Sequence, residues 1–239
     1  RRTGYMIVDH ILLPSGVELL VGSNRQARWS ESAIGGSPWS VDPDKAATAS
    51  GSGIFRVWSR DTRPWYFRPT DQYRLTESAL AAAAQWNEFE DNPLLDCLAP
   101  GMPALMGNPY PMEFFENGDT IELRFEEFDA VRVINFSAEA SDETVVASPL
   151  GYSVGRWEGD TLLVATSRIN WPYFDRVGIS QSDEVEVHEQ FRVVEDGNGL
   201  EYEMTVTDPQ TLLEPFIWQG RWAWRPGEEV NRSDCTLEE

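Results

Sequence analysis

Apolar and polar residues alternate with a period of two along most of this chain, as expected of β-strands that bury one face. Three alternating stretches are interrupted by residues that tolerate a positive φ, at 116–119, 158–160 and 196–199. Each interruption predicts a β-hairpin, and Pro-Ser-Gly at 14–16 predicts a further one between two apolar stretches. The chain is therefore expected to consist mainly of antiparallel strands.

Residues 76–88 depart from this alternation. They contain four consecutive alanines after Thr76 or Ser78, either of which would serve as the N-cap of a helix. The hairpins at 116–119 and 158–160 are spaced about forty residues apart, which suits a propeller blade, but three hairpins are too few to close a ring. We therefore predict an all-β fold, either an antiparallel, barrel-like (lipocalin-like) structure or a strongly curved sheet, with one short helix.

The same patterns divide the chain into three parts. Residues 1–29 form an N-terminal hairpin segment, and residues 30–52, rich in Gly, Ser, Pro and Ala, form a loop or linker. Residues 53–239 form the main barrel-like domain. We expect this domain and residues 1–29 to make one compact unit.

Glu189 stands out among the predicted inward positions. It shares its strand face with four apolar residues, namely Val185, Val187, Phe191 and Val193. A carboxylate on such a face must be paired, protonated or functional, because an isolated buried charge is too costly. Arg132, which alternates with Ile134, and Arg156, which shares a face with Val154, are the candidate partners. A structural Glu–Arg clamp remains the alternative to a catalytic site.

His10 is a second candidate for acid–base chemistry. It shares a face with three apolar residues, namely Met6, Val8 and Leu12. A histidine in such a place is more often a core residue with satisfied hydrogen bonds than a catalytic one. We keep it as a reserve acid or base.

Aromatic residues gather at two further places. Trp171 and Tyr173 flank a proline in a connection that also contains Asp175, and such rings are expected to cover something, for example a barrel mouth. A later strand places Trp218, Trp222 and Trp224 on one face with Gly220 between them. This stripe is either core or the wall of a pocket in which the glycine leaves room for a ligand ring.

Charge restricts the classes of partner. The chain has 40 Asp and Glu against 19 Lys and Arg, a formal net charge of −21, which repels nucleic acid and anionic lipid. No run of eighteen apolar residues exists, so no membrane span is expected. Asp9 and His10 interrupt the first apolar stretch, so it does not resemble a signal peptide. The protein is cytosolic, or a leader was removed before residue 1.

The sequence offers no motif for metal or cofactor chemistry. Two His and two Cys are scattered without the spacing of a metal site, and no nucleotide-binding or GxSxG motif is present. We therefore expect no cofactor. Cys97 and Cys235 form either a disulfide or two free buried thiols, and composition does not separate these alternatives.

Three segments resemble a largely uncharacterised family of exported bacterial β-rich proteins: CLAPGMPALMGNPYPMEF, LGYSVGRWEGDTLLVATSRIN and GISQSDEVEVHEQFRV. The resemblance runs from about residue 92 to the C-terminus, and GRWEGDTL is its most specific part. It implies a periplasmic or secreted protein and favours a Cys97–Cys235 disulfide. Two polar positions differ from the family pattern, at Gln181 and Gln190, which puts a shared activity in doubt.

These observations predict three kinds of function. The first is a cofactor-independent lyase, isomerase or hydrolase for a small apolar, probably aromatic compound, with Glu189 as acid or base and Arg156 or Arg132 orienting it. Tyr173 and Asp175 would assist, and the pocket would be walled by aromatic residues, namely Trp171, Trp218, Trp222 and Trp224. The second is a binding protein without turnover. The third is a structural or interaction module, possibly a homo-oligomer, for which a filled aromatic core would speak.

Overall fold

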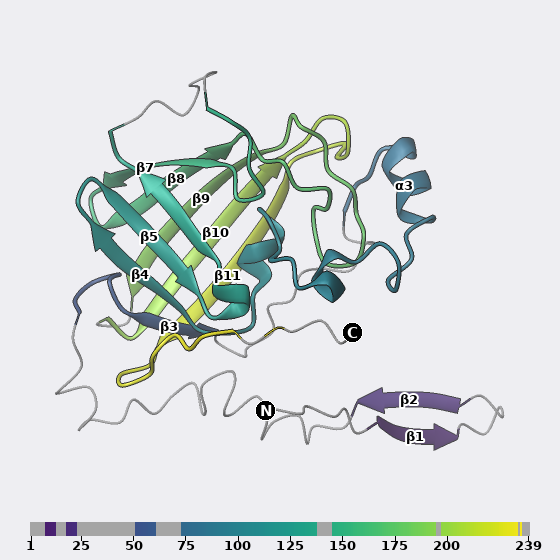
Figure 1. The fold of residues 1–239 in the computed structure, drawn as a ribbon, viewed down its shortest axis with the longest axis horizontal. Coiled ribbons are helices and arrows are strands. Elements are labelled where there is room, and N and C mark those ends of the chain that lie inside the picture. The colour runs from purple at the N-terminus through teal and green to yellow at the C-terminus, as the bar shows by residue number, and fades with distance from the viewer. Residues whose placement is uncertain are drawn as a thin grey trace.

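A computed structural model describes residues 8–12, 18–22, 51–60, 73–137, 145–194, 197–233 and 235. Nine strands form a closed barrel in which each strand lies next to its neighbour in the chain (Figure 1). The strands are β3 (Val57–Arg60), β4 (Met112–Asn117), β5 (Thr120–Phe125), β6 (Val131–Asn135), β7 (Tyr152–Glu158), β8 (Thr161–Ser167), β9 (Glu186–Val194), β10 (Gly199–Thr207) and β11 (Phe216–Trp224). The predicted all-β, barrel-like fold is confirmed.

One pair of neighbouring strands is parallel. Ile134 of β6 lies opposite Ser153 of β7, whereas the other neighbouring pairs of the barrel are antiparallel. An odd number of strands cannot alternate in direction all the way around a ring, so nine strands require one parallel pair. The connection over 136–151 supplies it by returning the chain to the end of the barrel where β6 began.

The hairpins fall where the sequence predicts them. β4 and β5 join at Gly118, and β7 and β8 join at Gly159, with φ values of 60° and 63° respectively. β9 and β10 are also paired antiparallel across their turn, of which residues 195–196 lie outside the described part. These tight turns gather at one end of the barrel, here named the hairpin end. Glycine suits them because a side chain rarely adopts a positive φ.

The opposite end, here named the loop end, carries the longer connections: 126–130, 168–185 and 208–215, together with the chain that precedes β4. That preceding chain holds α3 (Glu77–Ala83), capped by Thr76, whose hydroxyl accepts a hydrogen bond of 3.2 Å from the Ala79 amide. The predicted helix is thus confirmed and is the single α-helix of the described residues. Short 3₁₀ turns occur at η2 (Pro93–Asp96), η3 (Ala104–Gly107) and η4 (Glu127–Asp129).

η3 closes the barrel at the loop end. Its residues Leu105 and Met106 are buried, and the Met106 sulfur lies 3.7 Å from the Arg132 guanidinium inside the barrel. Arg60 of β3 donates a hydrogen bond of 2.5 Å to the Gly107 carbonyl and so ties the turn to the barrel wall. The interior therefore ends at a packed surface of protein.

β1 (Val8–Leu12) and β2 (Glu18–Gly22) form an antiparallel two-stranded sheet, as predicted for the first hairpin. The described pairings of these two strands are with each other, with His10 opposite Leu20. Their side chains lie outside the described part of the chain, as does most of the predicted linker, residues 30–50.

The barrel interior is filled by large side chains. Rings from different strands pack edge to face, including Phe114 against Phe191 at 5.3 Å and Tyr202 against Trp222 at 5.1 Å between centroids. Such pairs add about 0.5–1.5 kcal/mol each to the gain from burial. The largest fully buried side chains also include Trp58, whose indole N–H donates a hydrogen bond of 2.8 Å to the Ile54 carbonyl.

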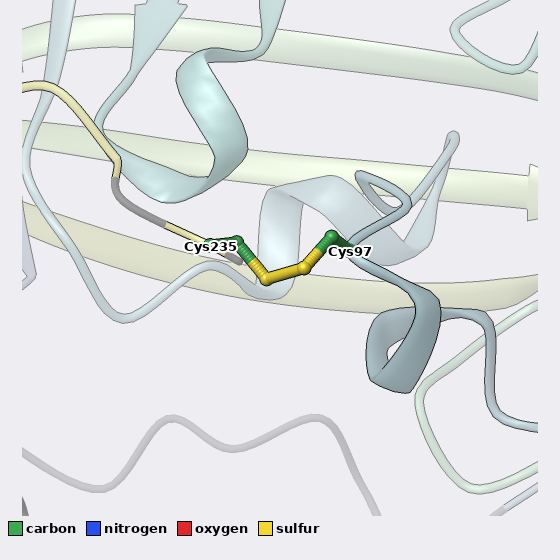
Figure 2. The surroundings of a disulfide bond; sticks show 2 residues. All are labelled: Cys97 and Cys235. Carbon is green, nitrogen blue, oxygen red and sulfur yellow. A yellow bond between two sulfur atoms is a disulfide. The ribbon is translucent and has the colours of Figure 1, made fainter. Parts of the chain in front are cut away.

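A disulfide joins Cys97 to Cys235, which settles the alternative that the sequence left open (Figure 2). On the way to Cys235 the chain crosses η4, where the Asn231 side chain donates a hydrogen bond of 3.0 Å to Glu126. The bridge closes a loop of 138 positions, which stabilises the fold by about 5 kcal/mol on chain-entropy grounds. The C-terminus is therefore fixed to the loop end.

Candidate functional site

The two charges predicted to face inward form an ion pair inside the barrel. Arg132 of β6 and Glu189 of β9 are both buried, with 1% and 2% of their surface exposed. The Nη1 group of Arg132 donates a hydrogen bond of 2.9 Å to Glu189 Oε1, and its Nη2 group donates to Oε2. Because β7 and β8 separate the two strands, this bidentate pair spans the interior.

Neighbouring side chains satisfy the remaining polar atoms of the pair. Arg132 donates to the hydroxyl of Ser153 at 3.0 Å and to that of Thr166 at 2.7 Å. The Tyr202 hydroxyl donates to Glu189 Oε1 at 2.7 Å. A buried ion pair is tolerated when such additional bonds satisfy its groups. The arrangement is that of an inward clamp.

Burial and charge change the acidities in this network. Desolvation by burial acts to lower the pKa of Arg132, but the charge and hydrogen bonds of Glu189 outweigh it, and the pKa is raised. Burial, together with the Glu189 charge, raises the pKa of Tyr202 well above its ordinary value. Arg132 therefore stays charged and Tyr202 stays protonated at neutral pH, which suits a fixed donor better than a group that exchanges protons.

Arg156, the other predicted partner of Glu189, lies on the outer face of β7. It forms an exposed ion pair with Glu158 at 2.6 Å. The inward positions of β7 are Ser153 and Gly155, so the face assigned to Arg156 from its apolar neighbours was wrong. Such exposed pairs contribute little to stability.

The aromatic stripe of β11 is largely core. Trp218 and Trp222 are buried in the interior, and Trp224 is partly exposed, with the Arg56 guanidinium 4.2 Å above its ring. A Cβ placed on Gly220 would lie 3.4 Å from atoms of both Trp218 and Tyr202. The space predicted beside this glycine for a ligand ring is therefore occupied by the protein's own rings.

The aromatic connection lies at the loop end, as predicted for a segment that covers a barrel mouth. Phe174 and Asp175 are buried, while Trp171 and Tyr173 are half-buried beside a cleft of about 10 Å³. Trp86, from the chain after α3, also lines this cleft. A space of this size holds about one water molecule.

Asp175 organises this connection. Its Oδ1 accepts hydrogen bonds from the backbone amides of Val177 at 2.9 Å and Ile179 at 3.1 Å. Burial raises the pKa of Asp175 despite these bonds and one from Tyr73. The pKa of Tyr173 is also raised, by burial and by the Asp91 charge.

The predicted acids thus belong to separate hydrogen-bond networks. The printed bonds of Asp175 are to its own connection, and those of Glu189 are to Arg132 and Tyr202. His10 lies on β1, where side chains are not described. The structure therefore joins Glu189 to Arg132 and leaves the other predicted catalytic residues elsewhere.

The sequence did not identify three residues of the interior network: Ser153, Thr166 and Tyr202. The alternation of Leu200, Tyr202 and Met204 between glutamates was a usable sign that Tyr202 faces inward. Ser153 and Thr166 gave no comparable sign, because short hydroxyl side chains occur on either face of a strand.

The loop end also carries an acidic segment, residues 87–98, that exposes apolar side chains. It contains four acids and no Lys or Arg. Phe89 is 85% exposed, and Leu95 and Leu98 are also largely exposed. Monomeric proteins seldom expose such residues together, and where they do a binding site is a common reason.

Hydrogen bonds hold this segment in place. The amide of Asn87 donates to Asp91 Oδ2 at 2.8 Å, the amide of Phe89 donates to Asn87 Oδ1 at 3.1 Å, and the Asp91 amide donates to the Asn87 carbonyl at 2.8 Å. Asn92 caps η2 by accepting from the Leu94 amide at 3.1 Å. The disulfide at Cys97 fixes the far end, so Phe89 is presented on a closed turn.

Within the described ranges, no group of three or more His, Cys, Asp or Glu side chains is placed to hold a metal ion. In the same part of the chain, no helix has the length and apolar character needed to cross a membrane.

No protein-family model matches the chain, and no curated protein matches it. The resemblance to exported bacterial proteins therefore stays a prediction.

Proposed function

We propose that this protein is a binding module that uses its loop end to recognise a basic, partly apolar segment of another protein. The observation that carries the proposal is Phe89, which is 85% exposed at the tip of a turn closed by its own hydrogen bonds. A solvent-exposed ring on an ordered turn supplies apolar contact area at low entropic cost on binding.

Charge selects the class of partner. Glu88, Glu90 and Asp91 surround Phe89, and Asp96 follows Leu95. A partner segment with Lys or Arg beside apolar residues would match this surface in both respects, and the chain's net charge of −21 would speed its approach. An acidic or nucleic-acid partner would be repelled.

The filled barrel supports a binding module over an enzyme with an interior site. Glu189 is engaged by Arg132 and Tyr202, and the position beside Gly220 is occupied by rings. Catalysis on a small aromatic compound would need this interior to open. That function stays a prediction, as does a homo-oligomer.

Titration with synthetic peptides tests the proposal. We expect an amphipathic peptide of leucine and lysine to bind saturably, and a lysine–serine peptide of equal charge to bind at least about tenfold more weakly. Phe89→Ser should reduce affinity for the first peptide by about tenfold or more. Ile217→Ser, which changes an exposed residue on β11, is the matched control and should leave affinity unchanged.

Equal binding of both peptides, or an unchanged affinity in Phe89→Ser, would show that charge alone attracts the peptides and would overturn the proposal. Self-association that Phe89→Ser abolishes, without peptide binding, would instead assign the surface to a second copy of the chain.

We also infer that the protein works in the periplasm or outside the cell. The Cys97–Cys235 bridge supports this inference, because disulfides persist mainly in oxidising compartments. The mass of protein isolated from its natural host without reductant should be two hydrogens below that of the free thiols, and a dithiol mass would contradict the inference.

A further inference from the structure

A groove of about 530 Å³ lies on the outer face of the barrel, over β8 to β11. Tyr202 and Gly220, whose side positions face inward, contribute to its floor. Its volume falls within the range of small-molecule sites. It lies on the barrel wall and is distinct from the acidic segment at the loop end.

The strand register arranges the side chains of the groove in two rows. Arg192, Glu201 and Arg221 face one another across β9, β10 and β11. In the next row, two residues along each strand, Gln190 lies opposite Glu203, and Glu203 lies opposite Gln219. Hydrogen-bonding groups thus cross three strands in parallel lines.

Contacts within the rows order these side chains. Arg192 donates to Glu201 at 2.7 Å, and the Gln219 amide donates to Glu203 at 2.8 Å. A guanidinium, an amide or a carboxylate held by a neighbour loses less freedom when it binds a ligand. The groove therefore presents partly ordered planar donors and acceptors.

Charge and polarity restrict the ligand. The two arginines and two glutamates balance, although the whole chain carries −21. A balanced site favours neither a strongly anionic nor a strongly cationic ligand, and the scarcity of apolar side chains in the rows disfavours an aromatic one. A neutral molecule with many hydroxyl groups fits, because each hydroxyl can donate to a carboxylate and accept from a guanidinium or amide.

We propose that the outer groove over β8–β11 is a binding site for a neutral oligosaccharide. Neighbouring hydroxyls of a sugar ring would bind the paired Glu203 and Gln219 side chains, and the Arg192 row would hold the next part of the chain. This site is independent of the peptide surface proposed at the loop end, so either proposal can fail alone.

The test is a titration, followed by amide NMR shifts, with four tetrasaccharides: a β-1,4-glucan, an α-1,4-glucan, a β-1,4-mannan and the charged tetragalacturonate. We expect at least one neutral tetrasaccharide to bind saturably, with shifts in β9–β11 and little dependence on salt. Gln219→Ala should weaken that binding by about tenfold, the effect of losing one well-placed hydrogen bond at a ligand.

Gln85→Ala, which removes an exposed glutamine at the loop end, is the matched control and should leave binding unchanged. The proposal is overturned if none of the neutral sugars binds, if tetragalacturonate binds better than they do, or if Gln219→Ala binds as the wild type does. Phe89→Ser should not affect this titration, which separates it from the peptide experiment.

Discussion

Arg132 and Glu189 lie 57 residues apart in the chain and meet in a bidentate ion pair across the barrel interior. The pair joins β6 to β9, two walls that share no backbone ladder. Ser153, Thr166 and Tyr202 bind the same two side chains, so four strands besides their own hydrogen bonds meet at one polar centre. This centre fixes the relative position of β6 to β10.

Glu189→Gln should therefore destabilise the fold. The substitution leaves the buried Arg132 charge without its counter-charge, a change that costs about 3–5 kcal/mol in comparable pairs. Denaturant unfolding measures it, and Glu158→Gln, in an exposed pair, should leave the midpoint nearly unchanged. Replacing both partners, as Arg132→Met with Glu189→Leu, should recover part of the loss. A Glu189→Gln protein of unchanged stability that loses turnover on some substrate would instead identify a catalytic carboxylate.

Strand parity predicts much of this centre from the sequence. It places Glu189 and Arg132 inward, because both alternate with residues that must be buried. It fails for Arg156, because Tyr152 and Val154 give the outer face of β7 an apolar appearance. The inner face is small for a physical reason: a Cβ on Gly155 would lie 2.7 Å from the Ile134 side chain. Such a close approach depends on the neighbouring strand and is invisible along one strand.

Asp175→Asn tests the pKa shift at the loop end. Because burial raises the folded-state pKa of Asp175, its contribution to stability is full below the ordinary pKa of 3.8 and is lost as pH rises through the raised value. An asparagine keeps an acceptor for the Val177 and Ile179 amides and carries no charge. The variant should match the wild type near pH 3 and be more stable at neutral pH.

Denaturant unfolding across this pH range gives the comparison. Asp175→Ala, which removes the acceptor, should cost about 1–3 kcal/mol at either pH. If Asp175→Asn loses stability on going from acid to neutral pH as the wild type does, the carboxyl is not the group that titrates.

The sequence shows that the aromatic connection covers the loop end but not what it packs against. The half-buried Trp171 and Tyr173 agree with a covering role. Their neighbour Trp86 comes from the chain after α3, and no local pattern links the two segments. Gly178 carries the only sign, and a single glycine in a loop has many explanations. Contacts between distant irregular segments leave no periodic trace, unlike those between strands.

Gly178→Ala should separate these two segments. Gly178 has a φ of +85°, and a Cβ there would lie 2.1 Å from Cγ of Trp86, so the alanine meets both backbone strain and a ring that must move. Gly159→Ala is the matched control, because its φ is +63° and nothing lies within 4 Å of the added Cβ.

The control should lose only the strain of a left-handed alanine, roughly 1–2 kcal/mol, whereas Gly178→Ala should lose more and change tryptophan fluorescence. It should also weaken binding of the leucine–lysine peptide, because displacement of Trp86 moves the turn that starts at Asn87 and presents Phe89. Equal losses of stability in the two variants, with peptide affinity intact, would mean that Trp86 yields without cost and that the acidic segment holds its shape without the aromatic connection.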